Sequence, residues 1–518
     1  MKNSRIYLSL LVSLCLISTS CSVNRSVDGV QPNIILILTD DLGYGELGCY
    51  GQQKIETPNI DKIAASGMRF TQFYSCAPVC APARYGLLTG IHSGHAYIRG
   101  NDEWDSRGDV WNYRSVLADS TLEGQRPLKE NTLTIAEVLK ENGYATGMIG
   151  KWGLGAPHSA SIPNNEGFGY FMGYNCQRQA HTYYPVHLYE NTHRLYLNND
   201  TVAPNTKLDK DVNPNDYSSY SDFNLNDYAP DIMFNGLSDF IDENKDRPFF
   251  LYWATPIPHA PIQAPQKWVD YYNDKFGVEE PYLGDKGYFP HPSPNAGYAA
   301  MISYLDENIG RLIEKLKDDG IYENTLIIVT SDNGPTYAGG VNAEFFNSAG
   351  PFNNGYGWTK GFVKEGGIRV PFIASWPRKI KSESVSDHIG VFYDIFPTLS
   401  EIGGCQNSGI NDGISFYNAM IEGEVQKKHE YIYWEFPEYG GQQAVRIGDW
   451  KGIRKNIQKG NMDIELYNLK EDIREESNIA DYNMDIVKRI KQIMIDEHSE
   501  AELDRFKMSA LGDTNNTQ

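Results

Sequence analysis

The sequence predicts an α/β protein with a mainly parallel central sheet, followed by a smaller C-terminal domain of sheet and helix. Three observations support this prediction. Apolar runs of strand length recur along the first 400 residues, segments of helical length lie between them, and after about residue 410 short strand-like runs with intervening Gly take over. Strands that are apolar on both faces and alternate with helices are typical of a parallel sheet covered by helices on both sides.

The first strand is predicted at residues 33–39, because Asn33-Ile-Ile-Leu-Ile-Leu-Thr39 is a continuous apolar run. Helix and strand then alternate: helix 132–142 with strand 144–149, helix 230–243 with strand 248–254, helix 296–317 with strand 325–330, and finally strand 370–375 with helix 393–402. Residues 196–228 are rich in Asn, Asp, Tyr and Ser, and we expect a long surface excursion there. These elements make up one large domain, predicted at residues 30–405.

The C-terminal domain is predicted at residues 410–510. Short strands are expected at 431–436, 443–447, 449–454 and 465–468, and a helix at 484–503. The polar tail from residue 512 onward lacks any such pattern.

Net charge excludes one class of function. The 518 residues contain 46 Lys plus Arg against 67 Asp plus Glu, a formal net charge of −21. Sequence-independent binding to nucleic acid needs a basic surface, so we expect no nucleic-acid partner. An anionic substrate would need positive charge supplied locally, against the field of the whole protein.

The first 21 residues indicate export. Lys2 and Arg5 precede the apolar run 6–17, which is too short to span a bilayer comfortably, and the small residues 18–20 come before Cys21. This segment resembles a bacterial lipoprotein signal peptide, cleaved before Cys21 and lipidated on its thiol. The prediction is a protein of the periplasm or outer membrane, held to the membrane only by a lipid anchor. Plain secretory cleavage nearby, and hence a secreted protein, is the alternative.

Two acidic strand ends predict a cation site. Asp40-Asp41 directly follows the first strand, and Asp332-Asn333-Gly334 directly follows the strand at 325–330. Adjacent carboxylates repel one another, and chemistry in parallel sheets gathers at the carboxyl ends of strands. Oxygen ligands suit a hard divalent ion, so Ca2+ is the expected ion and Mg2+ the alternative.

One cysteine is set apart by its motif. Cys80-Ala-Pro-Ala-Arg84 is followed by Leu87-Leu-Thr-Gly90, whereas Cys76 lacks such a context. Further segments follow in order, namely Gly150-Lys151-Trp152, Lys360-Gly361 and Glu365-Gly-Gly-Ile-Arg369-Val-Pro371. Together with the two acidic strand ends, this set resembles the type I sulfatases, whose motif cysteine is oxidised after translation to formylglycine. The resemblance runs from about residue 33 to 371, and Asp449-Trp450-Lys451 extends it into the C-terminal domain.

The resemblance implies an alkaline-phosphatase-like fold and a modified Cys80, made by a formylglycine-generating enzyme. A hydrated aldehyde has one hydroxyl to attack sulfur and a second that lets the group collapse and release sulfate. Arg84 lies one helical turn further on and would hold the diol. The modified Cys80 would also join Asp40, Asp41, Asp332 and Asn333 as a ligand of the cation.

Three further residues receive roles from the resemblance. Lys151 and Lys360 would clamp the sulfate oxygens as point charges. His259, in a Pro-rich loop after the strand at 248–254, would be the general acid for the leaving hydroxyl.

One position departs from the pattern. The commonest form of the middle motif is G-K-W-H-L-G, with a histidine that helps to deprotonate the diol, but this chain has Gly153 there. His181 is the favoured replacement and His95 the second candidate. Binding of sugar, or a purely structural role for His181, is the alternative. Arg178 is a further candidate for the substrate pocket.

These features predict an exo-acting sulfatase of sulfated glycans, with a sulfated galactose or N-acetylgalactosamine as substrate. Two alternatives stay open. Phosphodiesterases and phosphonate-ester hydrolases share this core and even the modified cysteine, and Gly153 would also fit a catalytically inactive glycan-binding lipoprotein.

Overall fold

The computed structural model describes residues 31–406, 409–421 and 425–514, so the predicted signal peptide and Cys21 lie outside the described residues. Within these ranges the chain forms a ten-stranded sheet in the order β10-β2-β9-β8-β1-β7-β3-β4-β5-β6. The strands are β1 (Asn33–Thr39), β2 (Met68–Tyr74), β3 (Ala145–Lys151), β4 (Tyr170–Tyr174), β5 (His187–Glu190), β6 (His193–Tyr196), β7 (Phe249–Ala254), β8 (Thr325–Ser331), β9 (Phe372–Ser375) and β10 (Ser384–Val391).

The centre of the sheet is parallel, which confirms the predicted α/β class. Strands β8, β1, β7, β3 and β4 run in one direction, while β9 runs against both of its neighbours and β5 and β6 add an antiparallel edge. Strand β9 is antiparallel to β8. The connection between them, residues 332–371, contains no helix long enough to carry the chain back to the other end of the sheet.

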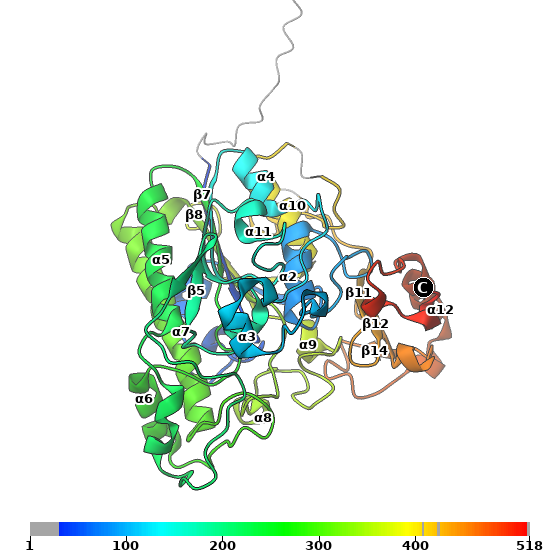
Figure 1. The fold of residues 1–518 in the computed structure, drawn as a ribbon. Coiled ribbons are helices and arrows are strands. Elements are labelled where there is room, and N and C mark those ends of the chain that lie inside the picture. Colours follow the sequence, from blue (N-terminus) through cyan, green and yellow to red (C-terminus); the bar gives the residue numbers. More distant parts are fainter. Residues whose placement is uncertain (1–30, 407–408, 422–424, 515–518) are drawn as a thin grey trace, which may run out of the picture.

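Helices cover both faces of this sheet (Figure 1). One layer contains α1 (Pro58–Ala65), α5 (Ala229–Asn244), α6 (Gln266–Phe276) and α7 (Pro294–Asp318); the other contains α2 (Cys80–Thr89), α4 (Ile135–Glu141), α10 (Ile395–Ile402) and α11 (Tyr417–Met420). Alternate residues of β1 enter the two cores, Ile34, Leu36 and Leu38 on one side and Ile35 and Ile37 on the other. Each such side chain stabilises the fold by roughly 1.5–3 kcal/mol through burial.

Two predicted boundaries shift for identifiable reasons. Helix α4 begins at Ile135 rather than at residue 132, because Thr134 and Glu137 form a capping box. Strand β3 continues to Lys151, so this lysine belongs to the strand end itself. Short helices α3 (Tyr113–Ala118), α8 (Ala343–Phe346) and α9 (Glu365–Ile368) lie in the connections.

A small C-terminal domain is also present, as predicted. Its antiparallel sheet comprises β11 (Ile432–Phe436), β12 (Gln442–Ile447), β13 (Trp450–Lys455) and β14 (Glu465–Asn468), and it packs against α12 (Met484–Asp496). Helix α12 stops well before the predicted residue 503. The chain turns there because the Glu497 carboxylate accepts a hydrogen bond from His92 and the Ser499 N–H donates to Gly94.

An ion network joins this sheet to the large domain. The Lys451 ammonium of β13 lies 2.8 Å from a Glu365 oxygen and 3.1 Å from a Glu475 oxygen, and all three side chains are buried. Two carboxylates therefore share one cation at the domain boundary. In the described part of the chain, no helix is both long and apolar enough to cross a membrane.

Candidate active site

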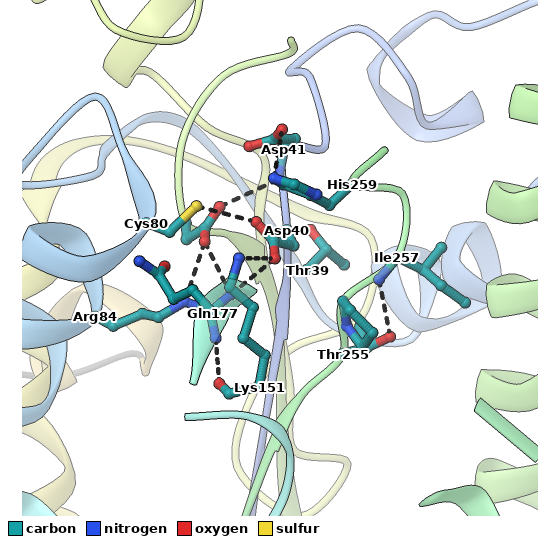
Figure 2. Close-up of polar contacts among 12 residues, drawn as sticks. Thr39, Asp40, Asp41, Cys80, Arg84, Lys151, Gln177, Thr255, Ile257 and His259 are labelled. Carbon is teal, nitrogen blue, oxygen red and sulfur yellow. Dashed lines mark hydrogen bonds and ion pairs between the residues drawn. The ribbon is translucent and has the colours of Figure 1, made fainter. Parts of the chain in front are cut away.

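The acidic residues predicted from two strand ends lie together. Strands β1 and β8 are adjacent and parallel, and the Asp332 N–H donates to the Thr39 carbonyl at 3.0 Å. The Asp41 N–H donates to Asp332 Oδ1 at 3.1 Å. Asp41 itself has φ of 67°, a left-handed conformation that is costly for a residue other than glycine. The backbone is thus turned so that both carboxylates of the pair face the same space (Figure 2).

Cys80 is the first residue of α2, and its side chain faces these carboxylates. Its Sγ lies 3.2 Å from Asp40 Oδ1, and the Lys360 ammonium lies 3.8 Å from the same sulfur. The next N–H of the helix, that of Ala81, donates to Asn101 Oδ1 at 3.1 Å. The predicted nucleophile position therefore lies at a helix N-terminus, where the helix dipole favours an anion.

Arg84 lies one turn along the same face of α2, as its spacing predicted. Its guanidinium is fully buried, donates to Asp332 Oδ2 at 2.9 Å and lies 3.5 Å from Asp40 Oδ2. A second nitrogen, Nη1, donates to the Lys151 carbonyl at 2.5 Å. Arg84 therefore ties α2 to the ends of β1, β3 and β8.

Two lysines complete the charge array. Lys151 Nζ, at the end of β3, lies 2.5 Å from Asp40 Oδ2, and Lys360 Nζ lies 2.6 Å from Asp41 Oδ1. Three carboxylates thus face three permanent cations, so the charge of the site is balanced although the whole chain is acidic. A divalent ion at the carboxylates would leave a net positive site for an anionic ester.

Burial and charge shift the titration of these groups. Burial raises the pKa of the Asp40 carboxyl, but Lys151 and the other cations outweigh it and hold that pKa well below its usual value. Burial and the neighbouring Asp40 raise the pKa of Asp332 to about 7. Burial, followed by the charges of Asp332 and Asp40, raises the pKa of the Cys80 thiol well above its usual value. An unmodified Cys80 is therefore a neutral thiol, which is a poor nucleophile.

The side chains present fit a hard cation. Asn333 Nδ2 donates to Asp41 Oδ1 at 2.8 Å, whereas Asn333 Oδ1 is buried and has no hydrogen-bond partner in the described structure. Ligand atoms of Asp40, Asp41, Cys80 and His259 lie within 4.8 Å of one another. A buried carbonyl oxygen without a donor, beside two carboxylates, is the arrangement that a cation with oxygen ligands would satisfy. Both oxygens of Asp332 accept hydrogen bonds, from Arg84 and the Asp41 N–H.

His259 follows β7 and points toward Asp41. Its Nδ1 lies 2.6 Å from the Ala260 carbonyl; a carbonyl oxygen only accepts, so Nδ1 carries the proton. The other nitrogen, Nε2, faces Asp41 Oδ2 at 3.8 Å. Burial and then Lys360 hold the pKa of His259 well below its usual value. Donation from Nε2 requires a second proton, which the negative charge of a bound ester would favour.

His181 lies against His259 and not at Gly153. The two imidazoles stack with ring centres 5.4 Å apart, and Tyr288 packs edge-on against both at 5.2 and 5.6 Å. In the described residues no hydrogen bond involves the His181 side chain. The structure therefore places His181 on the side of the site where His259 would meet the leaving group.

The space beside Gly153 is filled by Gln177. Gly153 has φ of +75°, and a Cβ built there would lie 2.8 Å from Gln177 Cγ. Gln177 Nε2 donates to Asn101 Oδ1 at 3.1 Å, the same oxygen that accepts the Ala81 N–H. Gln177 Oε1 is buried and has no partner in the described structure. The Gln177 amide therefore fills the space that a side chain at position 153 would enter, and Asn101 links it to the first turn of α2.

Two other sequence candidates have different surroundings. The Arg178 guanidinium stacks on the Trp111 ring at 4.2 Å and donates to the Trp111 carbonyl at 2.6 Å, so it lies at a half-exposed rim. His95 Nδ1 lies 3.2 Å from the Asp412 carboxylate, and among the described residues no hydrogen bond or ion pair joins His95 to Cys80. His95 pairs instead with this carboxylate, from the segment just before α11.

A second group of possible metal ligands contains His92, His95 and Asp412. Its geometry argues against a cation. The Gly94 N–H donates to His92 Nδ1 at 3.0 Å, so the ring proton is on Nε2, where it can donate to Glu497 at 3.0 Å. A metal at Nε2 would need that proton on Nδ1, facing another N–H.

The sequence did not single out Gln177, Asn101 or Tyr288. An amide or a phenol in a loop has no titration or spacing signature that marks it as functional. Gln177 could have been found only by asking which side chain replaces the histidine missing at Gly153, in the loop that also holds Arg178 and His181.

Comparison with known proteins gives a consistent result. A family described as Sulfatase matches residues 32–405, and one described as N-sulphoglucosamine sulphohydrolase, C-terminal, matches residues 354–500. The chain is 31% identical to N-acetylgalactosamine-6-sulfatase of Canis lupus familiaris, over 85% of this chain and 74% of that one. It is 32% identical to arylsulfatase A of Homo sapiens, over 81% of this chain and 74% of that one. Among solved structures, Ps i-CgsB in complex with k-i-k-neocarrahexaose superposes with a TM-score of 0.70 and 25% identity, covering 94% of this chain and 95% of that one.

Proposed function

Because this chain belongs to the sulfatase family and is a sulfuric ester hydrolase, we propose that it removes sulfate from a terminal galactose or N-acetylgalactosamine of sulfated glycans. The similarity to an N-acetylgalactosamine-6-sulfatase supports this sugar type. The likeness to a structure that holds a neocarrahexaose supports an oligosaccharide substrate.

One observation carries the proposal. Cys80 stands at a helix N-terminus between the Asp40 carboxylate and the Lys360 ammonium, with Lys151 and Arg84 buried beside it. An acid-rich protein has thus placed three cations, those of Arg84, Lys151 and Lys360, around one side chain. That arrangement suits a small anionic group bound next to position 80.

The raised pKa of Cys80 keeps its thiol neutral and therefore a poor nucleophile. This supports the modification of Cys80 to formylglycine by a formylglycine-generating enzyme. Hydrated formylglycine supplies a hydroxyl as nucleophile at this position. Asp40 lies 3.2 Å from the present Sγ and can accept the proton of a group placed there. The Gln177 amide, which fills the space beside Gly153, cannot take up a proton as the missing histidine would.

The residues that would hold a cation are Asp40, Asp41, Asn333, position 80 and Asp332. Ca2+ is our first choice because carboxylate and amide oxygens dominate this set, and the bound ion would neutralise charge on the ester oxygens. Both oxygens of Asp332 already accept hydrogen bonds, from the Asp41 N–H and from Arg84. Asp332 would therefore bind the cation while it still accepts from Arg84.

The lysines and His259 act on the substrate itself. An ammonium has three donors, so Lys151 and Lys360 can each bind an ester oxygen while keeping the carboxylate that now positions them. His259 can donate to the leaving hydroxyl from Nε2, because Ala260 holds the other ring proton. His181, stacked on His259, lies where the sugar would enter.

The test is a panel of sulfated monosaccharides that differ only in sugar and sulfate position, with released sulfate measured by ion chromatography. We expect one galactose-type sulfate to be hydrolysed at least about tenfold faster than the others. Cys80→Ala should abolish turnover and His181→Ala should lower it strongly. Near-normal turnover by His181→Ala would remove that residue from the mechanism.

The same preparation separates the two rival functions. An aryl phosphate or phosphonate ester turned over far better than the matched aryl sulfate would replace the sulfatase proposal by that of a phosphodiesterase. Unmodified Cys80 in protein from the native host, with binding of glycan but no turnover, would indicate a glycan-binding lipoprotein.

We also propose that the protein is exported and anchored through lipidated Cys21, with secretion as the alternative. The support is the sequence pattern of residues 1–21.

A further inference from the structure

A cavity outside the site around Cys80 lies next to helix α8 and opens to solvent. Its volume is about 650 Å³, and its aromatic lining consists of Tyr282, Tyr337 and Tyr356. Tyr356 is 65% exposed and packs edge-on against Tyr337 with ring centres 4.8 Å apart. The size suits a ligand of one or two sugar rings, and pockets of this kind bind small molecules through aromatic faces and a few polar groups.

One loop, which lines the cavity at Tyr337 and Gly340, connects it to the active site. The loop after Asn333 runs from the acidic strand end directly to Tyr337, and the Lys360 N–H donates to the Pro335 carbonyl of this loop at 3.2 Å. At the same loop, a Cβ on Gly339 would lie 3.0 Å from the ring of Tyr288. Tyr288 in turn packs against the imidazoles of His181 and His259. A molecule bound at Cys80 and extended past Tyr288 would therefore reach the cavity.

The charges of the cavity select against a second anionic group. Glu280, Asp285 and Glu344 line it together with one ammonium, that of Lys286. None of these four charged side chains has an ion-pair partner among the residues that the structure describes. Three carboxylates against one ammonium would repel a sulfated or carboxylated sugar, yet carboxylates accept hydrogen bonds from neutral hydroxyls. The site around Cys80, by contrast, has three cations, Arg84, Lys151 and Lys360, that would attract an anionic group.

We propose that this cavity is a subsite for an uncharged sugar ring linked to the sulfated unit. The inference rests on the proposed function and makes it more specific: the substrate is an oligosaccharide whose terminal sugar carries the sulfate and whose neighbouring sugar carries no charge. Tyr337 and Tyr356 provide aromatic faces for the C–H side of that ring. The carboxylates accept its hydroxyl hydrogens.

The first experiment compares three substrates of the purified enzyme: the sulfated monosaccharide found by the panel, its disaccharide with an unsulfated neighbour, and the same disaccharide sulfated on both rings. We expect kcat/KM to be about tenfold higher for the monosulfated disaccharide than for the monosaccharide, equivalent to one aromatic contact and a hydrogen bond. Tyr337→Ala and Tyr356→Ala should remove most of this advantage and leave the monosaccharide rate unchanged. Tyr482→Ala, which alters a tyrosine that is 87% exposed in the C-terminal domain, is the matched control and should change neither rate.

A second experiment does not depend on turnover. Saturation-transfer NMR with the unsulfated disaccharide should show binding to the wild-type enzyme and to Cys80→Ala, with about tenfold weaker binding to Tyr337→Ala. The subsite is overturned if the unsulfated disaccharide does not bind, or if the doubly sulfated disaccharide is the best substrate. Binding of the disaccharide without release of sulfate from any substrate would instead overturn the proposed function and leave the subsite standing.

Discussion

Replacement of Gly153 by alanine tests whether Gln177 fills the space beside Gly153. The new Cβ would enter a left-handed backbone with φ of +75°, which costs about 1–2 kcal/mol for a residue other than glycine. It would also lie 2.8 Å from Gln177 Cγ, and overpacking of this kind costs about 1–3 kcal/mol. We therefore expect Gly153→Ala to lower the free energy of unfolding by about 2–5 kcal/mol, the sum of these two costs.

A double-mutant cycle separates the two costs. The free energy of unfolding is measured by urea titration with tryptophan fluorescence for the wild type, Gly153→Ala, Gln177→Ala and the double variant. In the Gln177→Ala background the clash is absent, so Gly153→Ala should cost only the backbone share of about 1–2 kcal/mol. An equal cost of Gly153→Ala in both backgrounds would show that Gln177 does not occupy this space.

Three further predictions concern other parts of the molecule. Lys451→Met should lower the free energy of unfolding by about 3–5 kcal/mol, because Glu365 and Glu475 would lose the buried cation that they share; a loss below about 1 kcal/mol would mean that the network does not hold the domains together. Dialysis against a chelator should abolish sulfate release, Ca2+ should restore it, and Asn333→Ala should raise the Ca2+ concentration needed; full activity of enzyme shown by mass spectrometry to be metal-free would contradict a cation role. Cys21→Ser should move the protein of the native host from the membrane fraction to the soluble fraction, and an unchanged distribution would exclude the lipid anchor.

Much of the fold could be predicted because its core strands carry their own signal. The run 33–39 is apolar at every position between its ends, and the structure buries all of β1. The strand at 68–74 was not predicted, since Arg69, Thr71 and Gln72 interrupt its apolar pattern. That strand lies near the sheet edge and is only partly buried, so its sequence has no need to be apolar throughout.

The site could be predicted where parallel topology decides the outcome. Asp40 and Asp332 end adjacent parallel strands, so their meeting follows from the strand assignments alone. The partners of Arg84 could not be predicted, because a helix turn specifies the face of a side chain but not which of several acids it meets. The glycine at position 153 was visible in the sequence. That Gln177 fills the space beside it depends on the path of the segment after β4, which has no hydrophobic periodicity to predict it.

The most direct test of the account measures modification and sulfate release on one preparation. Protein from the native host is digested, and the peptide that contains Cys80 is weighed, while released sulfate is measured from the monosulfated disaccharide. We predict a peptide about 18 Da lighter than the thiol form and a turnover that rises in proportion to the modified fraction. Undiminished sulfate release from protein whose Cys80 is entirely thiol would contradict the account.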